Sequence, residues 1–128
     1  MNFFDKLSQT ATQTYKYTQD KTNKLAKTAK LKANINENKQ KVEDLYLEIG
    51  KQVYENHVRE EKIDIVAKIE DICKEIDAYT DEIESSRKEI LKLKDLKQCK
   101  VCSFEMELDY EFCPKCGAKQ QSNNNENN

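Results

Sequence analysis

Four cysteines near the end of the chain are spaced so that they can bind one metal ion. They form two pairs, Cys99 with Cys102 and Cys113 with Cys116, and ten residues separate the pairs. A tight turn over each pair aims two thiolates at one point, and two such turns complete the tetrahedron that Zn²⁺ prefers, with Zn–S distances of about 2.3 Å. The spacing therefore predicts one structural zinc ion. Because four thiolates close the coordination shell, we expect no catalytic residue at this metal.

The same cysteines leave other chemistry open. Two disulfides agree with the count, but no secretory signal opens the chain, and thiols stay reduced in the cytoplasm, where we expect this protein. A redox-active C-x-x-C normally occurs singly beside a βαβ pattern, which the sequence lacks, and iron is a further alternative. Cys73 lies within a helical pattern, so we expect a small buried or half-buried residue and not a ligand.

The residues around the cysteines favour two tight turns and a short β-hairpin. Pro114 and Gly117 suit the second turn, since proline stiffens it and glycine tolerates a positive φ. In the first turn, Ser103 stands where a glycine is expected. Between the pairs, acidic residues alternate with apolar ones, as in one or two strands with an apolar face. The apolar residues are Phe104, Met106, Leu108, Tyr110 and Phe112. About thirty residues bury too little surface to fold alone, so we expect metal binding to supply most of the folding free energy.

The composition of the whole chain favours long amphipathic helices. Of 128 residues, 37% are hydrophobic and 36% are charged, and only two glycines and one proline are present. This profile does not suit a thick globular core with a substrate pocket, so we expect no enzyme. No apolar run approaches the length of about 18 residues that a membrane span needs.

A continuous heptad pattern predicts a long helix over about residues 62–97. The repeating positions are Ile69, Ile72, Ile76, Tyr79, Ile83, Ser86, Ile90 and Leu93. An upstream stripe consists of Ile35, Val42, Leu45, Tyr46, Ile49 and Val53.

The two apolar patterns are out of phase by one residue, or about 100° of helix, and the polar segment 56–62 separates them. We therefore expect an antiparallel helical hairpin or coiled coil over residues 35–98, with a single long helix in a parallel dimer as the alternative. Gly50, inside the first helix, suggests a close helix contact. His57, the only histidine, falls in the predicted turn and is expected to face solvent.

The N-terminal arm, residues 1–34, is the basic part of the chain. Seven lysines against two aspartates give it a charge of +5, whereas residues 35–98 carry −5 and residues 99–128 carry −2. An approximately 11-residue apolar period predicts a nearly straight stripe along a helix. The stripe consists of Phe4, Leu7, Ala11, Tyr15, Thr18, Thr22, Leu25 and Ala29. Such an arm is either a basic amphipathic helix on an anionic membrane surface, or a solvated and partly disordered extension. Residues 120–128, which are rich in Gln and Asn, are predicted to be a disordered tail.

Three stretches resemble a family of small, mostly bacterial zinc-ribbon domain-containing proteins. They are the Phe-Phe-Asp-Lys-Leu start at residues 3–7, the Leu-Tyr-x-Glu-Ile-Gly-Lys segment at residues 45–51 and the Phe-Cys-Pro-x-Cys-Gly-Ala-Lys segment at residues 112–119. The resemblance implies a zinc ribbon over residues 99–119 with zinc on the four cysteines, and it implies no reaction. The first turn departs from the family pattern at Lys100, Val101 and Ser103.

These features favour a non-enzymatic adaptor that binds a protein partner. The hairpin is then a spacer, the zinc module a docking head and the arm an anchor on an anionic membrane, which makes the protein cytoplasmic or peripheral to the membrane. A homodimer is a further option for the helices. The alternative is a nucleic-acid binder, although an acidic zinc module suits phosphate badly. A thiol oxidoreductase is the third candidate, and it needs an accessible cysteine of low pKa.

Overall fold

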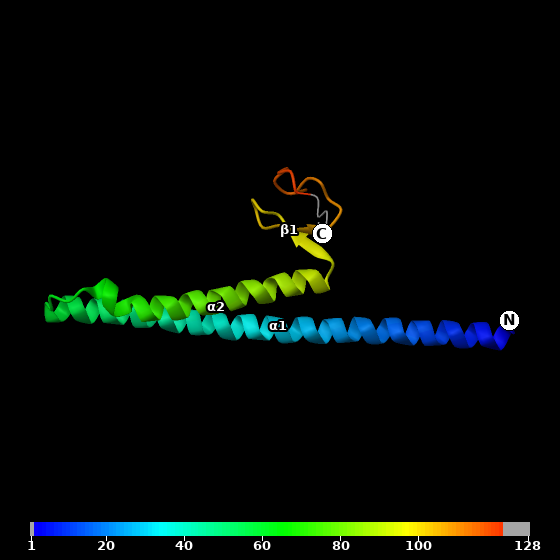
Figure 1. Cartoon of the computed structure of the whole chain (residues 1–128), viewed down its shortest axis with the longest axis horizontal. Coiled ribbons are helices and arrows are strands. Elements are labelled where there is room, and N and C mark those ends of the chain that lie inside the picture. The colour runs from blue at the N-terminus through cyan, green and yellow to red at the C-terminus, as the bar shows by residue number, and fades with distance from the viewer. Residues whose placement is uncertain (1, 122–128) are drawn as a thin grey trace, which may run out of the picture.

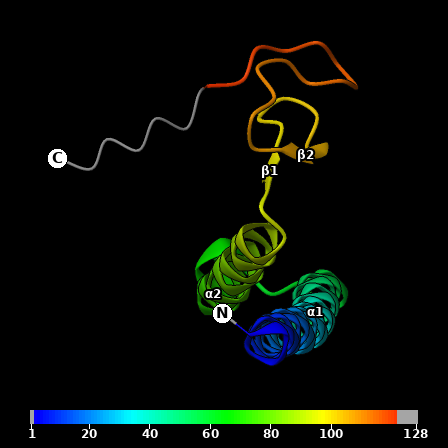
Figure 2. The same ribbon diagram turned by 90° about the vertical axis from the view of Figure 1, so that its right-hand side faces the viewer.

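The computed structural model describes residues 2–121 and shows a helical hairpin followed by a small two-stranded sheet. Helix α1 spans Phe3–Arg59 and helix α2 spans Ile65–Leu93. Strands β1 (Leu96–Gln98) and β2 (Glu105–Glu107) pair antiparallel. Helix α2 folds back along α1, and the sheet lies on the side of α2 that faces away from α1 (Figure 1, Figure 2). The predicted mainly α fold with a small C-terminal β module is confirmed.

The hairpin turn begins inside the polar segment 56–62 and needs neither glycine nor proline. Glu60 ends α1 in a left-handed conformation with φ 53°, and its backbone N–H donates to the carbonyl of His57. Asp64 then starts α2, because its carboxylate accepts a hydrogen bond from the backbone N–H of Ala67 at 3.2 Å. Two polar caps therefore reverse the chain, and the hairpin is formed instead of one continuous helix.

A heptad seam on each helix holds the hairpin together. All eight positions predicted on α2, from Ile69 to Leu93, are buried or half-buried. The facing positions on α1 are Thr28, Leu31, Ile35, Asn38, Val42, Leu45, Ile49 and Gln52. The core of the seam consists of Ile35 and Val42 packed with Ile83 and Ile90. Alternating 3- and 4-residue spacing on both helices is the pattern of coiled-coil packing.

The sequence assigned two residues of α1 wrongly to the seam. Tyr46 is 58% exposed and Val53 is 44% exposed, whereas Asn38 is buried to 2% exposure. The heptad continues through polar residues on α1, so apolar character alone follows the wrong side of the helix there. The close contact expected at Gly50 is also absent within the described chain, because a Cβ added at Gly50 would meet no atom within 4 Å.

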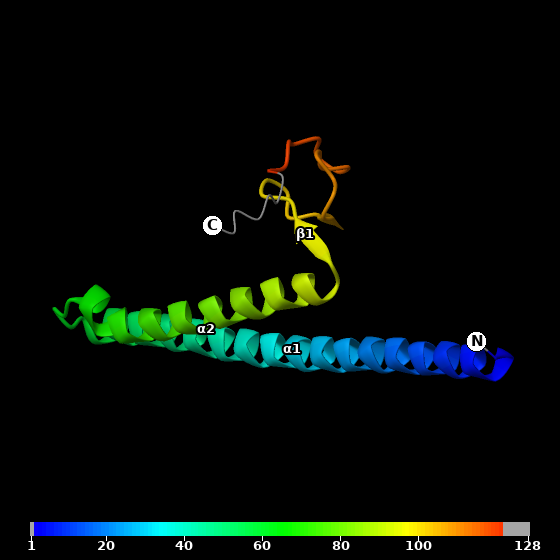
Figure 3. The same cartoon turned by 45° about the vertical axis from the view of Figure 1, so that its right-hand side comes forward.

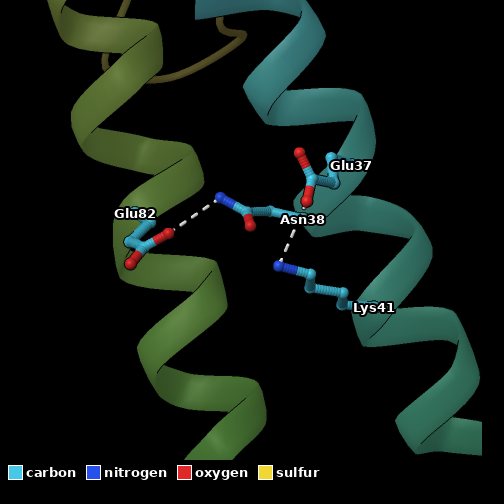
Figure 4. A network of polar contacts seen from close by, with 4 residues as sticks. All are labelled: Glu37, Asn38, Lys41 and Glu82. Atoms are coloured by element: carbon cyan, nitrogen blue, oxygen red, sulfur yellow. Dashed lines mark hydrogen bonds and ion pairs between the residues drawn. The ribbon is translucent and has the colours of Figure 1, made fainter.

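Polar side chains replace apolar packing in the middle of the seam (Figure 4). The Asn38 side-chain amide donates to a carboxylate oxygen of Glu82 across the hairpin at 2.9 Å. Lys41, one turn later, forms an ion pair with Glu37 at 3.3 Å, and its ammonium group lies 5.2 Å from the centre of the Tyr79 ring. A buried amide that has a partner only in one alignment specifies the register of the two helices.

The N-terminal arm continues α1 without a break and projects past the end of α2 (Figure 1, Figure 3). Every described residue before Thr28 is exposed, and the seam starts at Thr28. The structure therefore ends the free arm near residue 27 and not at residue 34, because residues 28–34 already pack on α2. No helix within residues 2–121 combines the length and apolar character needed to cross a membrane.

The end of α2 also differs from the predicted boundary at residue 98. Helix α2 stops at Leu93, Lys94 caps it, and Asp95 turns the chain with φ 54°. The next three residues form β1, in which Lys97 lies opposite Met106. The strand that begins the zinc module therefore lies inside the range assigned to the hairpin, since a three-residue strand has too few residues to show a period.

We predict that Ile83→Ala destabilises the hairpin by about 2 kcal/mol, because it leaves a cavity in the four-residue core. Thermal or urea unfolding followed by circular dichroism at 222 nm measures the change. Val66→Ala is the control on the same helix, since Val66 is 65% exposed. Its unfolding free energy should stay within about 0.5 kcal/mol of the wild type, and equal effects of the two substitutions would contradict the seam.

Candidate metal centre

The two cysteine pairs lie in turns of the same construction. In the first, Cys99 donates its N–H to the carbonyl of Phe104 at 2.8 Å, and its carbonyl accepts from Ser103 at 3.0 Å. In the second, Cys113 donates to the carbonyl of Ala118 at 2.9 Å, and its carbonyl accepts from Gly117 at 2.9 Å. Each turn thus brings two thiols to the same side of the backbone.

The turns place the four sulfurs around one point. All four Sγ atoms lie within 4.8 Å of one another, with Cys99 to Cys116 at 3.6 Å and Cys102 to Cys113 at 3.5 Å. In a tetrahedron with Zn–S bonds of about 2.3 Å, the sulfurs are about 3.8 Å apart. The cluster therefore fits a single zinc ion, and the four predicted ligands are brought together. The two short S···S distances join sulfurs from different turns, so one metal ion ties the turns to each other.

Comparison with known proteins agrees with this geometry. Residues 94–122 match a family model that describes a zinc ribbon domain. This segment is a zinc ribbon. No curated protein and no solved structure matches the chain. The matched range starts before β1, so the family model and the structure place the start of the ribbon at nearly the same residue.

Left-handed residues close both turns of the ribbon. Ser103 has φ 65° and Gly117 has φ 76°. The sequence comparison of the two turns correctly predicted that the position of Ser103 suits glycine. A side chain in this conformation costs about 1–2 kcal/mol, whereas glycine adopts it freely.

Backbone N–H groups favour thiolate at the first cysteine of each turn. The N–H of Cys102 lowers the pKa of the Cys99 thiol to about 6, although burial opposes it. Burial raises the pKa of Cys113, but N–H groups of its own turn outweigh that effect and leave the pKa below its ordinary value. For Cys116, the N–H of Ala118 lowers the pKa, but burial and the neighbouring thiols together raise it to about 12. Zinc therefore has to displace a proton from Cys116.

Gln120 belongs to the ribbon, although the sequence placed it in the tail. It is 7% exposed, and its backbone N–H donates to the carbonyl of Glu111 at 2.7 Å. Its side-chain amide donates to Cys99 Sγ at 3.4 Å and to the carbonyl of Ala118 at 2.8 Å. A donor to a ligating sulfur stabilises its negative charge. No local signal separates this glutamine from its Gln- and Asn-rich neighbours. The rest of the predicted tail, from residue 122, lies outside the described residues.

The apolar face predicted between the cysteine pairs is only partly correct. Met106, on β2, is 3% exposed and packs beside Cys99 and Cys113. The other large apolar residues of this segment are between 39% and 58% exposed, and they are Phe104, Leu108, Tyr110 and Phe112. Only one short strand forms there, because the chain bends after Glu107 and the alternation no longer corresponds to two sides of a sheet.

Two further residues were singled out in the sequence. Cys73 is half-buried on α2, outside the thiol cluster, as expected for a residue that is not a ligand. His57 lies in the last turn of α1 and not beyond its end, although it is near the predicted turn.

We predict that Cys113→Ser abolishes stoichiometric zinc binding and unfolds the ribbon, while the hairpin stays helical. The ribbon has a very small core, so the metal supplies most of its stability. Metal content measured by atomic emission, together with circular dichroism at 222 nm, tests this. Cys73→Ser is the matched control and should retain one zinc per chain. Unchanged zinc content in Cys113→Ser would contradict the four-cysteine site.

A second prediction concerns the strained first turn. Ser103→Gly should stabilise the zinc-loaded ribbon by about 0.5 kcal/mol, because relief of a left-handed side chain, about 1–2 kcal/mol, exceeds the entropy cost of glycine, about 0.5–1 kcal/mol. Gly117→Ser should destabilise it for the same reason. Competition with a zinc chelator measures both variants, and a stronger retention of zinc by Gly117→Ser than by Ser103→Gly would contradict the explanation.

Proposed function

We propose that this protein is a non-enzymatic adaptor whose projecting helical arm binds an anionic membrane surface and whose zinc ribbon binds a protein. The observation that carries the proposal is the preformed arm. Helix α1 extends past the hairpin, and its tip carries Phe3 and Phe4 at 74% and 76% exposure. The two rings stand edge to face, 6.0 Å apart. Nothing within the described chain covers this aromatic tip.

The composition of the arm suits the interface between lipid and water. Its apolar stripe includes Phe4, Leu7 and Leu25, and lysines lie around the rest of the helix. A lysine near an anionic surface contributes about 1 kcal/mol, and aromatic rings enter the headgroup region. The net charge of +5 on residues 1–34 therefore favours anionic over neutral lipid.

Threonines in the arm have their hydroxyl groups satisfied by the helix itself. Five of them donate to the carbonyl four residues earlier at 2.8–2.9 Å: Thr10, Thr12, Thr14, Thr18 and Thr22. A hydroxyl that is already hydrogen-bonded costs less to remove from water than a free one. The threonine-rich stripe is therefore less polar than its composition suggests, which supports contact with an apolar boundary.

The ribbon offers a second surface for binding. Four large apolar side chains remain exposed within residues 104–112, although the ribbon needs only Met106 in its core. Such a concentration of exposed aromatic and aliphatic side chains on a small module is typical of an interaction site. The ribbon faces away from α1, so the hairpin leaves this surface free (Figure 2). A closed shell of four thiolates supports a structural and not a catalytic role for the zinc.

We predict that the full zinc-loaded chain floats with anionic vesicles and not with neutral ones, and that binding weakens as salt screens the lysines. Deletion of residues 2–20 should abolish flotation without touching the seam, which starts at Thr28. The double substitution Phe3→Ser and Phe4→Ser should reduce it at least about tenfold.

The matched control removes two exposed apolar residues elsewhere, with Ile63→Ser and Val66→Ser, which are 45% and 65% exposed. This variant should float like the wild type. Equal loss in the control and the arm variants, or flotation that survives the deletion, would contradict membrane binding by the arm. Arm-dependent binding to DNA or RNA without binding to vesicles would instead favour the nucleic-acid alternative.

A further inference from the structure

An exposed apolar stripe on α1 is used by neither the hairpin nor the ribbon. It consists of Tyr46, Leu47, Gly50, Val53 and Tyr54, and we name it the Gly50 stripe. Its four side chains are 58%, 73%, 44% and 67% exposed, in chain order. A Cβ added at Gly50 would meet no atom within 4 Å. The stripe is therefore an open helix surface with a groove at its centre, where the backbone itself is accessible.

The stripe faces away from α2. The seam positions of this segment, Leu45, Ile49 and Gln52, are half-buried, and at 100° per residue they are centred about 130° from the stripe. The ribbon lies beside the other end of α2, far from the hairpin turn (Figure 3). The charged residues of the segment also avoid the stripe by about 100–160°, and they are Asp44, Glu48, Lys51 and Glu55.

The side chains of the stripe are arranged symmetrically about Gly50. Leu47 and Val53 lie three residues before and after it, and Tyr46 and Tyr54 lie four residues before and after it. In an antiparallel pair of identical helices that crosses at Gly50, each side chain meets its counterpart from the other copy. This is the self-complementary pattern that a two-fold interface requires.

We propose that a second copy of this chain docks on the Gly50 stripe, with the two α1 helices antiparallel and crossing at Gly50. Glycine at the crossing point lets the two backbones approach, so that the flanking ridges of Leu47 and Tyr54 enter the grooves of the other helix. This also explains why a residue that is unfavourable in a helix interior lies where it makes no contact within its own chain.

Charge complementarity distinguishes the antiparallel arrangement from a parallel one. Glu43 and His57 lie seven residues before and after Gly50, on the same side of the helix as the stripe. An antiparallel crossing places each Glu43 carboxylate opposite an imidazole of the other copy, which can donate a hydrogen bond to it. A parallel crossing places the two Glu43 carboxylates opposite each other, which is unfavourable.

The dimer has a consequence for the shape of the assembly. From Gly50 to Phe3, α1 rises by about 70 Å, so the two arm tips point in opposite directions about 140 Å apart. The zinc ribbons lie toward the two ends in the same way. Few side chains enter the crossing, so its buried area is close to the lower limit of about 1,200 Å² for a specific interface, and we expect a dissociation constant in the range of about 1–100 μM. This inference does not rest on the proposed function, since it concerns neither the arm tip nor the ribbon surface.

Sedimentation equilibrium of the full zinc-loaded chain over a range of concentrations tests the proposal. The mass should rise from 15.0 kDa toward twice that value. Tyr54→Lys should raise the dissociation constant at least about tenfold. Tyr17→Lys is the matched control, because Tyr17 is 69% exposed on the same helix, and it should leave the constant unchanged. Monomers at every concentration up to about 1 mM, or equal effects of the two substitutions, would overturn the proposal and leave the stripe to a different protein.

Gly50→Leu separates dimerisation from helix stability. In the monomer the added side chain meets open space, so the thermal midpoint of the helices should rise. At the crossing it separates the two backbones, so dimerisation should weaken at least about tenfold. A variant that is more stable and dimerises as well as the wild type would overturn the crossing at Gly50.

A charge exchange tests the orientation. His57→Glu should weaken the dimer, because it places two carboxylates opposite each other at each of the two equivalent contacts. Addition of Glu43→Lys to that variant should restore the dimer to within about threefold of the wild type, since each contact then joins opposite charges. A dimer that the exchange leaves unrestored would overturn the antiparallel arrangement.

Discussion

Burial of the heptad seam between α1 and α2 is the constraint on which the rest of the structure depends. Helix α1 has 57 residues and α2 has 29, so α2 can cover only part of its partner. The seam runs from the hairpin turn to Thr28, and everything before Thr28 projects as an arm. The same alignment brings the end of α2 beside the middle of α1, where the chain leaves the hairpin and enters the ribbon. The length difference between two helices thus determines where both candidate binding surfaces lie.

The hairpin and the ribbon are stabilised by different physical means. In the hairpin, apolar residues repeat over about seven turns, and a buried amide and carboxylate, Asn38 and Glu82, specify their alignment. The ribbon has no comparable core, since Met106 is its one buried large apolar side chain within the described residues. Four thiolates around a metal ion replace that core. The large apolar residues of the ribbon are consequently not needed for folding and remain available at its surface.

The exposed apolar residues of α1 belong to two separate surfaces with different physical character. The arm tip combines aromatic rings with an excess of lysines, which suits an anionic interface of variable shape. The Gly50 stripe has a symmetric set of side chains around an accessible backbone, which suits one defined partner geometry. A dimer through the stripe would present two arms and two ribbons from one rod, and paired weak sites bind an extended surface more tightly than single ones.

The sequence by itself determined those features whose cause is local. Two C-x-x-C turns suffice to aim four thiols at one point, so Cys99, Cys102, Cys113 and Cys116 were identified correctly, as was the unusual place of Ser103. The α2 seam was also read correctly from Ile69 to Leu93, because its heptad is apolar at almost every position. Only the tertiary structure decided which side of α1 is covered. Asn38 is buried and Tyr46 is exposed, since burial depends on where the other helix lies and not on the polarity of one residue. Gln120 and the open face of Gly50 were undetermined for the same reason, because each depends on segments that are distant in the sequence.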